Sequence, residues 1–350
     1  LEKAEDLQKA IAAGARWFRL PCGYRQRPHL ENSRAICAAS RQAGIQVKLL
    51  LDLPSSRPRT GSMQELKLSI GDRVLFWDPE DGMMEPEQNG VTHVPLPGLA
   101  VLIPKLQIKH RMWFCDGRLS FMIEELNDGT VLARMEKGTI PLKSSNSIFL
   151  PDSPSPFRVM TPHDCDLLQA FRRERIAPDW IALSLVGSAE DVQYARKEAG
   201  EQLGGSPKIM AKFETEQALS CIDEIIEEAD GIMVARGDLG LAVGYIRLPE
   251  AQETLVAAAR RAGKPVVVAT QALEVFSETG LPQRAELSDL SLIARQRADA
   301  VMLGKETVFS PRPIECIRFA AEMLAYETRR FEHSSGGNAQ KQFKAHTMAR

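Results

Sequence analysis

Three strand-like segments follow one another between Lys208 and Thr307, and this stretch decides the fold. They read Ile209-Met-Ala-Lys212-Phe-Glu214, Gly231-Ile-Met-Val-Ala-Arg236-Gly237-Asp238-Leu-Gly240 and Lys264-Pro-Val-Val-Val-Ala-Thr270-Gln271. Each is a short apolar run that ends abruptly in polar or charged residues, which is typical of a buried parallel strand whose carboxyl end opens into a site. Three successive strand ends thus bring a lysine, two carboxylates, an arginine and a threonine to one region. Such a set suits an anionic substrate handled with a metal ion.

Alternating helix and strand patterns continue on both sides of this stretch. Strands are expected at 15–20, 46–52, 179–185, 208–213, 231–235, 264–270 and 299–303. Repeated βα units of this kind predict an α/β fold, a (β/α)8 TIM-type barrel with helices outside. The barrel needs eight strands, and the missing first one would precede the helix predicted at 2–13. We therefore expect the first strand to be absent from the chain and the gap to be covered by upstream sequence, a loop, the tail or a neighbouring chain, since unpaired strand edges favour aggregation.

A different texture interrupts the barrel pattern from about 62 to 150. Short strand-like pieces such as Ile70-Gly-Asp-Arg-Val-Leu-Phe are separated there by Gly, Asp and Pro, which predicts a small inserted β-barrel domain. The expected domains are a first barrel segment at 1–61, the inserted β domain at 62–150, a second barrel segment at 151–328, and a tail at 329–350. The tail lacks periodicity and is predicted to be disordered.

Composition excludes several functional classes. The 350 residues carry 44 basic and 46 acidic side chains, for a net charge of -2. The sequence contains no long basic run of the kind that would favour a nucleic-acid partner. No run approaches the ~18 apolar residues of a membrane span. Six cysteines without a C-x-x-C pair favour free thiols in a reducing compartment, and a cytoplasmic location is expected. The chain begins at Leu1, directly in a helical pattern. This start is typical of a fragment of a longer protein, and removal of a targeting segment would explain it equally well.

Several motifs taken together resemble the pyruvate kinase family. The family's Lys-Ile-Glu strand end, its Ala-Arg-Gly-Asp-Leu-Gly turn and its Ala-Thr-Gln-Met-Leu-Glu strand end match Lys212-Phe-Glu214, Ala235-Arg-Gly-Asp-Leu-Gly240 and Ala269-Thr-Gln-Ala-Leu-Glu274. Its Thr-Arg-Ala-Glu and Met-Leu-Ser-Gly-Glu-Thr segments are similar to Gln283-Arg-Ala-Glu286 and Met302-Leu-Gly-Lys-Glu-Thr307. The resemblance covers nearly all of 1–325, and the family's C-terminal regulatory domain is not seen after residue 330. It implies phosphoryl transfer between phosphoenolpyruvate and ADP, giving pyruvate and ATP.

The resemblance also implies roles for the barrel residues. Glu214 and Asp238 would hold Mg²⁺ or Mn²⁺, a hard ion that takes few protein oxygens and keeps positions open for substrate. Lys212 would stabilise charge on the transferring phosphoryl group and the enolate oxygen. Gly237 and Asp238, where a helix begins, would hold the substrate carboxylate through backbone N–H groups. Thr270 would lie beside the enolate carbon and assist its protonation.

Two further arginines are implied by the same resemblance. Arg59 aligns with the family's phosphoryl-contacting arginine, a catalytic and substrate-binding role, and Arg19 aligns with an arginine near the nucleotide phosphates. Each assignment has a plainer alternative. Lys212 and Glu214 suit a structural ion pair, Asp238 a helix cap, and Thr270 a packing position. Arg19 and Arg59 also suit solvated surface charges, and Asp116 before Gly117 a simple turn.

Departures from the family pattern concentrate around the monovalent cation. Pro21, Gly23 and Leu53 stand where the family has side-chain oxygens, and Asp52 alone cannot build a potassium site. The K⁺ site is therefore predicted to be lost, with Arg25 or Arg27 replacing its charge. Two nucleotide contacts of the family are also missing, because Gly187 replaces a family arginine and Phe309 replaces a family lysine.

Three functions stay open on these residues. The first is pyruvate-kinase-like transfer, Mg²⁺-dependent, weak and K⁺-independent. The second is other Mg²⁺-enolate chemistry on a 2-oxo acid, such as decarboxylation or aldol cleavage, and the third is non-catalytic metabolite binding or regulation. Homo-oligomerisation is compatible with each of them. Lys212→Ala is expected to abolish turnover and leave folding intact, because the proposed role of the lysine is in the transition state.

Overall fold

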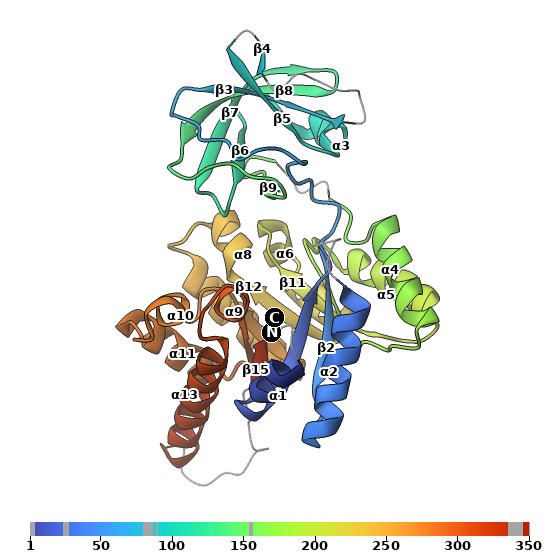
Figure 1. Ribbon diagram of the computed structural model, residues 1–350, viewed down its shortest axis with the longest axis vertical. Coiled ribbons are helices and arrows are strands. Elements are labelled where there is room, and N and C mark those ends of the chain that lie inside the picture. Colours follow the sequence, from blue (N-terminus) through green and yellow to red (C-terminus); the bar gives the residue numbers. More distant parts are fainter. Residues whose placement is uncertain are drawn as a thin grey trace. The chain divides into compact units, whose positions relative to one another are not determined.

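The computed structural model divides the chain into two compact units. It describes residues 4–23, 28–79, 87–88, 90–153, 157–334 and 346–349. The first unit comprises Leu1–Ser55 with Val159–Arg350, and the second comprises Ser56–Arg158 (Figure 1). The second unit therefore extends beyond the insert predicted at 62–150 at both of its ends.

Eight parallel strands close the first unit into a barrel (Figure 1). Their order around the barrel is β1-β15-β14-β13-β12-β11-β10-β2. The predicted α/β class with a parallel sheet is confirmed. The strands are β1 (Ala15–Pro21), β2 (Lys48–Leu53), β10 (Trp180–Leu183), β11 (Lys208–Phe213), β12 (Gly231–Ala235), β13 (Val266–Ala269), β14 (Ala300–Leu303) and β15 (His346–Ala349).

Helices connect these strands and cover the barrel. Two of them, α4 and α5, begin with capping boxes, in which Thr161 with Asp164 and Ser188 with Asp191 satisfy the free N–H groups of the first turn. The helices of this unit are α1 (Ala4–Ala12), α2 (His29–Ala43), α4 (Pro162–Arg173), α5 (Ala189–Leu203), α6 (Glu216–Ser220), α7 (Ile222–Glu228), α8 (Arg236–Val243), α9 (Leu248–Arg261), α10 (Glu274–Thr279), α11 (Arg284–Gln296), α12 (Lys305–Val308) and α13 (Pro313–Ser334).

The C-terminal segment corrects two predictions. Eight parallel strands come from this one chain, so the count of seven was wrong: β15 pairs in parallel with β1 and with β14. Disorder over 329–350 was also wrong where α13 continues to Ser334 and where β15 forms. Of the expected ways to cover the gap, the structure uses the tail. The four residues of β15 are too few to show a periodic pattern in the sequence. They form a strand because the edges of β1 and β14 supply hydrogen-bond partners for their backbone and because Met348 is completely buried in the barrel interior.

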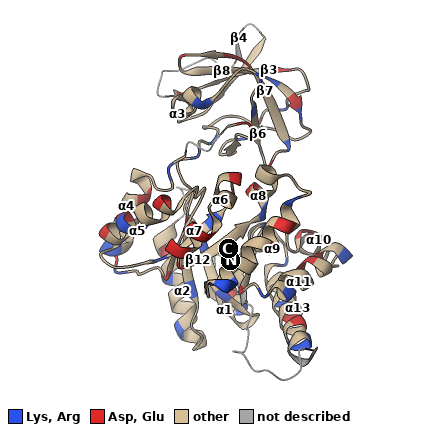
Figure 2. Ribbon diagram, turned by 180° about the vertical axis from the view of Figure 1, so that it is seen from behind, with Lys and Arg blue, Asp and Glu red and all other residues tan. Residues whose placement is uncertain are grey.

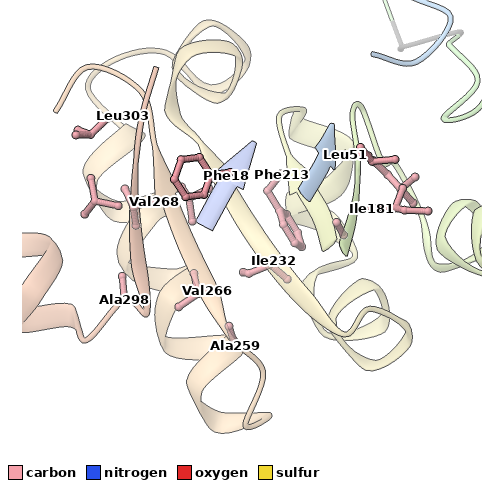
Figure 3. Close-up of a cluster of buried hydrophobic side chains, with 14 of the residues drawn as sticks. Phe18, Leu51, Ile181, Phe213, Ile232, Ala259, Val266, Val268, Ala298 and Leu303 are labelled. Atoms are coloured by element: carbon pink, nitrogen blue, oxygen red, sulfur yellow. The ribbon is translucent and has the colours of Figure 1, made fainter. Parts of the chain in front are cut away.

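Two apolar layers follow from the alternation of side chains along each strand. Phe18, Leu51 and Phe213 point outward and pack with residues of the covering helices (Figure 3). A separate interior cluster takes side chains from all eight strands, with the Trp17 and Trp180 ring centroids 5.4 Å apart. The interior cluster is Trp17, Leu50, Trp180, Ala182, Met210, Met233, Val267, Ala269, Ala300, Met302 and Met348. The barrel is therefore filled by side chains and is not a pore.

The second unit is a β domain with its own core. Phe76, Phe114 and Phe121 form its centre, with ring centroids 5.3 to 5.8 Å apart. The described strands form a seven-stranded sheet in the order β4-β5-β3-β8-β7-β6-β9, and its closure into the predicted small barrel stays a prediction. The elements are β3 (Arg73–Trp77), β4 (Glu87–Gln88), β5 (Val91–Pro95), α3 (Leu99–Leu102), the 3-10 helix η2 (Ile103–Lys105), β6 (Arg111–Phe114), β7 (Leu119–Asn127), β8 (Thr130–Lys137) and β9 (Ile148–Phe149).

Surface charge is mixed in sign over the helices. Helices α4, α5 and α13 each carry both basic and acidic residues (Figure 2), as expected for a net charge of -2. Within the described part of the chain, the helices are too short or too polar for any of them to span a membrane.

Candidate active site

Four polar side chains lie one step beyond the interior apolar layer. Arg19, Asp52, Ser184 and Lys212 each come two residues after a member of that layer: Trp17, Leu50, Ala182 and Met210. Because alternate residues of a strand share a face, these four side chains share the face of the interior cluster at the carboxyl ends of β1, β2, β10 and β11. Polar residues at this step make one end of the barrel hydrophilic, as the sequence pattern predicts for a site.

Lys212 is the centre of this polar group. Its ammonium nitrogen is 3.1 Å from Glu214 Oε1 and 3.2 Å from Asp52 Oδ1, and it donates to Ser184 Oγ at 2.7 Å. Ser184 Oγ in turn donates to the Leu53 carbonyl at 2.7 Å. Burial acts to lower the pKa of Lys212, but the charges of Asp52 and Glu214 outweigh it and hold the pKa above its ordinary value. The lysine is therefore a fixed, buried cation at neutral pH.

Glu214 is held from two sides. Its Oε1 faces Lys212, and its Oε2 accepts a hydrogen bond of 2.7 Å from the backbone N–H of Leu185. Leu185 has φ 58°, in the left-handed region that a leucine rarely adopts. This backbone turn after β10 directs an N–H group at the carboxylate. Glu214 is 3% exposed, and these two contacts help to orient its carboxylate.

Asp52 pairs with Arg19 as well as with Lys212. Arg19 Nε donates to Asp52 Oδ2 at 2.5 Å. Burial acts to raise the pKa of Asp52, but the two cations outweigh it and leave the pKa below its ordinary value. Arg19, expected near the nucleotide, is thus placed in the same network as Lys212, with a guanidinium that has further N–H donors to offer.

Residues expected at a potassium site do not fit that ion. Pro21 lies in register with Asp52 on the neighbouring strand, and neither Pro21, Gly23 nor Leu53 has a side-chain oxygen. Asp52 is already neutralised by two cationic side chains. A desolvated cation needs several oxygen ligands, and this position offers a guanidinium instead. Arg25 and Arg27, predicted to replace the charge, lie outside the described residues.

The start of α8 meets the turn after β13. Gly237 and Asp238 lie in the first turn of α8, whose N–H groups have no acceptor within the helix. A Cβ atom placed on Gly237 would lie 3.8 Å from Thr270 Cγ2 and 3.9 Å from its Oγ1, so the threonine side chain stands beside this glycine. Because β12 pairs with both β11 and β13, Gly237 after β12 lies between the strand that carries Lys212 and the strand that Thr270 follows.

Mg²⁺ fits the chemistry of two of these carboxylates. Among the described residues, no group of three or more His, Cys, Asp and Glu side chains is suited to hold a metal. Mg²⁺ is commonly held by one or two carboxylates, with water and substrate completing its shell. Glu214 offers a buried, oriented carboxylate, and carboxylate oxygens are ligands that this hard ion takes. With Asp238 on the adjacent strand-to-helix connection, the donor set suits a hard divalent ion.

Arg59 belongs to the second unit. Its guanidinium donates to the Ser145 carbonyl at 3.1 Å, and its backbone forms an antiparallel bridge with Ser147. Its role in substrate binding stays a prediction.

Comparison with known proteins decides the family. Residues 1–317 match the family model of the pyruvate kinase barrel domain. The chain belongs to the pyruvate kinase family. It is 35% identical over 316 residues to a pyruvate kinase of Methylorubrum extorquens, covering 89% of this chain and 63% of that protein. A pyruvate kinase of Thermococcus litoralis is 30% identical over 339 residues, covering 96% and 69%.

A third relative also matches nearly the whole of this chain. A pyruvate kinase of Geobacillus stearothermophilus is 30% identical over 342 residues, covering 95% of this chain and 56% of that protein. The chain therefore spans between 56% and 69% of the length of these three relatives. The resemblance inferred from motifs is confirmed at the level of the family.

Sequence reasoning missed some of the residues that surround Lys212 and Thr270. Asp52, which the sequence analysis treated only as part of a lost potassium site, and Ser184 both accept hydrogen bonds from Lys212. The sequence signal that could have identified both residues is their position at the carboxyl ends of predicted strands. Arg236, Asp289 and Glu306 surround the turn that carries Thr270. Asp289 lies inside α11 and carries no sequence signal for this role.

Proposed function

We propose that this chain transfers a phosphoryl group between phosphoenolpyruvate and ADP, giving pyruvate and ATP, with Mg²⁺ or Mn²⁺ and without K⁺. The proposal treats the closed parallel barrel as a (β/α)8 TIM-type scaffold, in which active sites lie at the carboxyl ends of the strands. Family membership supports the reaction class. The polar group at the ends of β1, β2, β10 and β11 supports the location.

The observation that carries the proposal is the buried, charged Lys212. Its side chain is 8% exposed, and its ammonium group lies between two carboxylates, which keep it protonated. When the bond between phosphorus and the enol oxygen breaks, negative charge builds on that oxygen and on the phosphoryl group. A preorganised cation in a site of low dielectric stabilises such charge more in the transition state than in the ground state.

Substrate would be anchored at the start of α8. The backbone N–H groups of Gly237 and Asp238, in the first turn of α8, suit the carboxylate of phosphoenolpyruvate, because helix N-termini bind anions. Thr270 would then face the methylene carbon of the enolate, where its hydroxyl assists proton delivery after phosphoryl transfer. The proximity of the Thr270 side chain to Gly237 supports this assignment.

Glu214 and Asp238 would hold the divalent ion. When bound, Mg²⁺ or Mn²⁺ supplies positive charge that offsets the charge of the substrate's carboxylate and phosphoryl groups. Arg59 is proposed to contact the phosphoryl group and Arg19 the nucleotide phosphates. The pairing of Arg19 with Asp52 supports a reaction that does not require K⁺, because a fixed guanidinium already neutralises the carboxylate left from the cation site.

A coupled assay separates this proposal from its alternatives. Phosphoenolpyruvate, ADP and Mg²⁺ are supplied with lactate dehydrogenase and NADH, and pyruvate is measured as NADH oxidation. ADP-dependent pyruvate formation that Lys212→Ala abolishes is the expected result. Pyruvate formed equally without ADP would point to other enolate chemistry. Retained phosphoenolpyruvate binding with no product from the wild-type chain would indicate a non-catalytic role and overturn the proposal.

A further inference from the structure

The turn that follows β13 has an unusual backbone. Thr270 has φ 74° and Gln271 has φ 54°, so two consecutive residues other than glycine adopt the left-handed region. This region is especially unfavourable for a β-branched residue such as threonine. Such a conformation persists only where surrounding groups determine it. The surrounding contacts therefore identify what sets the position of the Thr270 side chain.

Arg236 holds the first half of this turn. Its guanidinium donates from Nε to the Ala269 carbonyl at 3.1 Å and from Nη2 to the Thr270 carbonyl at 2.5 Å. The remaining edge contacts Asp289 on α11, with Nη1 at 2.6 and 2.8 Å from the two carboxylate oxygens. The Arg236 side chain is 12% exposed. One rigid planar group thus spans two consecutive carbonyls and a carboxylate, an arrangement that a lysine cannot reproduce.

Glu306 holds the second half of the turn. This carboxylate is 1% exposed, and its Oε1 accepts from the backbone N–H groups of Ala272 at 3.0 Å and Leu273 at 3.2 Å. Its Oε2 accepts from the N–H of Gly304 at 2.8 Å. The carbonyls before the turn are therefore bound to a cation and the N–H groups after it to an anion. Both side chains come from other strand ends of the barrel.

We propose that Arg236 and Glu306 are positioning residues that fix the Thr270 hydroxyl beside Gly237 for protonation of the enolate. The inference rests on the proposed function for its chemistry and on the contacts above for its geometry. In this step the O–H bond of the hydroxyl breaks as the enolate electron pair forms the new C–H bond, and water returns a proton to the hydroxyl oxygen. The distance between the hydroxyl and the methylene carbon therefore controls this step. Neither positioning residue needs to touch substrate. Loss of either should impair proton transfer more than substrate binding.

Arg236→Lys and Glu306→Gln test the inference, with Arg196→Lys as the matched control. Arg196 also joins an aspartate to a main-chain carbonyl, contacting Asp230 at 2.8 Å and the Glu228 carbonyl at 2.7 Å, but near the amino-terminal ends of β11 and β12. A general loss of guanidinium bonding would affect both Arg→Lys variants alike. Thermal unfolding of each variant identifies any that fails to fold, and Asp289→Asn then replaces Arg236→Lys.

Kinetics separate positioning from a merely structural role. Deuterium uptake into the methyl group of pyruvate is measured in D2O with Mg²⁺ and ATP, beside kcat and KM for phosphoenolpyruvate. Arg236→Lys should lower exchange and kcat on the order of 100-fold, the size of effect that misplacing a group by ~1 Å produces, with KM nearly unchanged. Combined with Thr270→Ala it should add little to the effect of Thr270→Ala alone. Fully additive losses, or normal exchange in Arg236→Lys, would overturn the inference.

Backbone amide exchange gives a readout that needs no turnover. In mass spectrometry, the peptide containing Ala272 and Leu273 should exchange faster in Arg236→Lys and Glu306→Gln than in the wild type, with Arg196→Lys unchanged. If the wild-type chain shows no transfer activity, the proposed function fails, and this measurement alone decides whether these residues hold the turn. Equal protection in all variants would overturn the positioning role whatever the activity.

Discussion

Replacing Lys212 with alanine should remove both turnover and some of the stability of the barrel. Asp52 and Glu214 are 3% exposed each, and the substitution would leave both carboxylates beside a cavity without their shared cation. Breaking a buried pair by removing one partner costs about 3–5 kcal/mol, because a buried charge is left uncompensated. Asp52 retains Arg19 and Glu214 retains the Leu185 N–H, so the lower end of the range, about 3 kcal/mol, applies.

This magnitude revises the expectation that folding stays intact. A loss of 1 kcal/mol lowers Tm by about 2–4 °C for a unit of this size, so Lys212→Ala should unfold roughly 6–12 °C below the wild type at neutral pH. Turnover should fall on the order of 1000-fold, as for loss of one preorganised donor to a developing oxyanion. Differential scanning calorimetry and the coupled assay measure the two effects. Lys9→Ala, which breaks a surface pair with Glu5, is the control and should change neither.

The pH dependence of stability provides a further check on the same group. The pKa of Lys212 is raised above its ordinary 10.5, so its contribution is complete below about pH 10.5 and is lost as pH rises through the folded value. The pKa of Asp52 is depressed below its ordinary 3.8, so its contribution is present above about pH 3.8 and is lost as pH falls through the folded value. Lys212→Ala should lack the alkaline loss. A variant with normal turnover, or with the Tm of the wild type at neutral pH, would refute the reasoning.

Three further predictions concern the ions and the barrel closure. Activity should be the same in K⁺ and in tetramethylammonium, because Pro21, Gly23 and Leu53 supply no ligand oxygens; strong activation in a K⁺ titration would contradict the loss of the site. Glu214→Gln should weaken Mn²⁺ binding measured by electron paramagnetic resonance at least about tenfold, since a charged hard ligand becomes neutral; an unchanged affinity would place the ion elsewhere. Met348→Ala should lower stability by about 2–3 kcal/mol in urea unfolding if β15 completes the barrel, because this side chain is fully buried in the interior; a neutral effect would show that the segment does not close it.

The sequence by itself was sufficient to predict the parallel α/β architecture and to select the strand ends of the candidate site. Short apolar runs ending at Lys212 and Glu214 determine which residues are buried and where the chain leaves the strand, because a period of two assigns each side chain to a face. The order of motifs was also sufficient to identify the family. These features are local, since each of them is complete within one short segment of the chain.

Only the tertiary structure decided how distant segments meet. The pairing of Arg19 with Asp52 and of Lys212 with Ser184 depends on the register of β1, β2, β10 and β11, which no single segment encodes. The same holds for the eighth strand: His346–Ala349 has no pattern of its own, and it is extended because two strand edges offer hydrogen bonds on either side. The left-handed turn at Thr270 likewise requires Arg236 and Glu306 from other strand ends. Contacts that stabilise an unfavourable local conformation come from outside it, and for that reason the local sequence cannot reveal them.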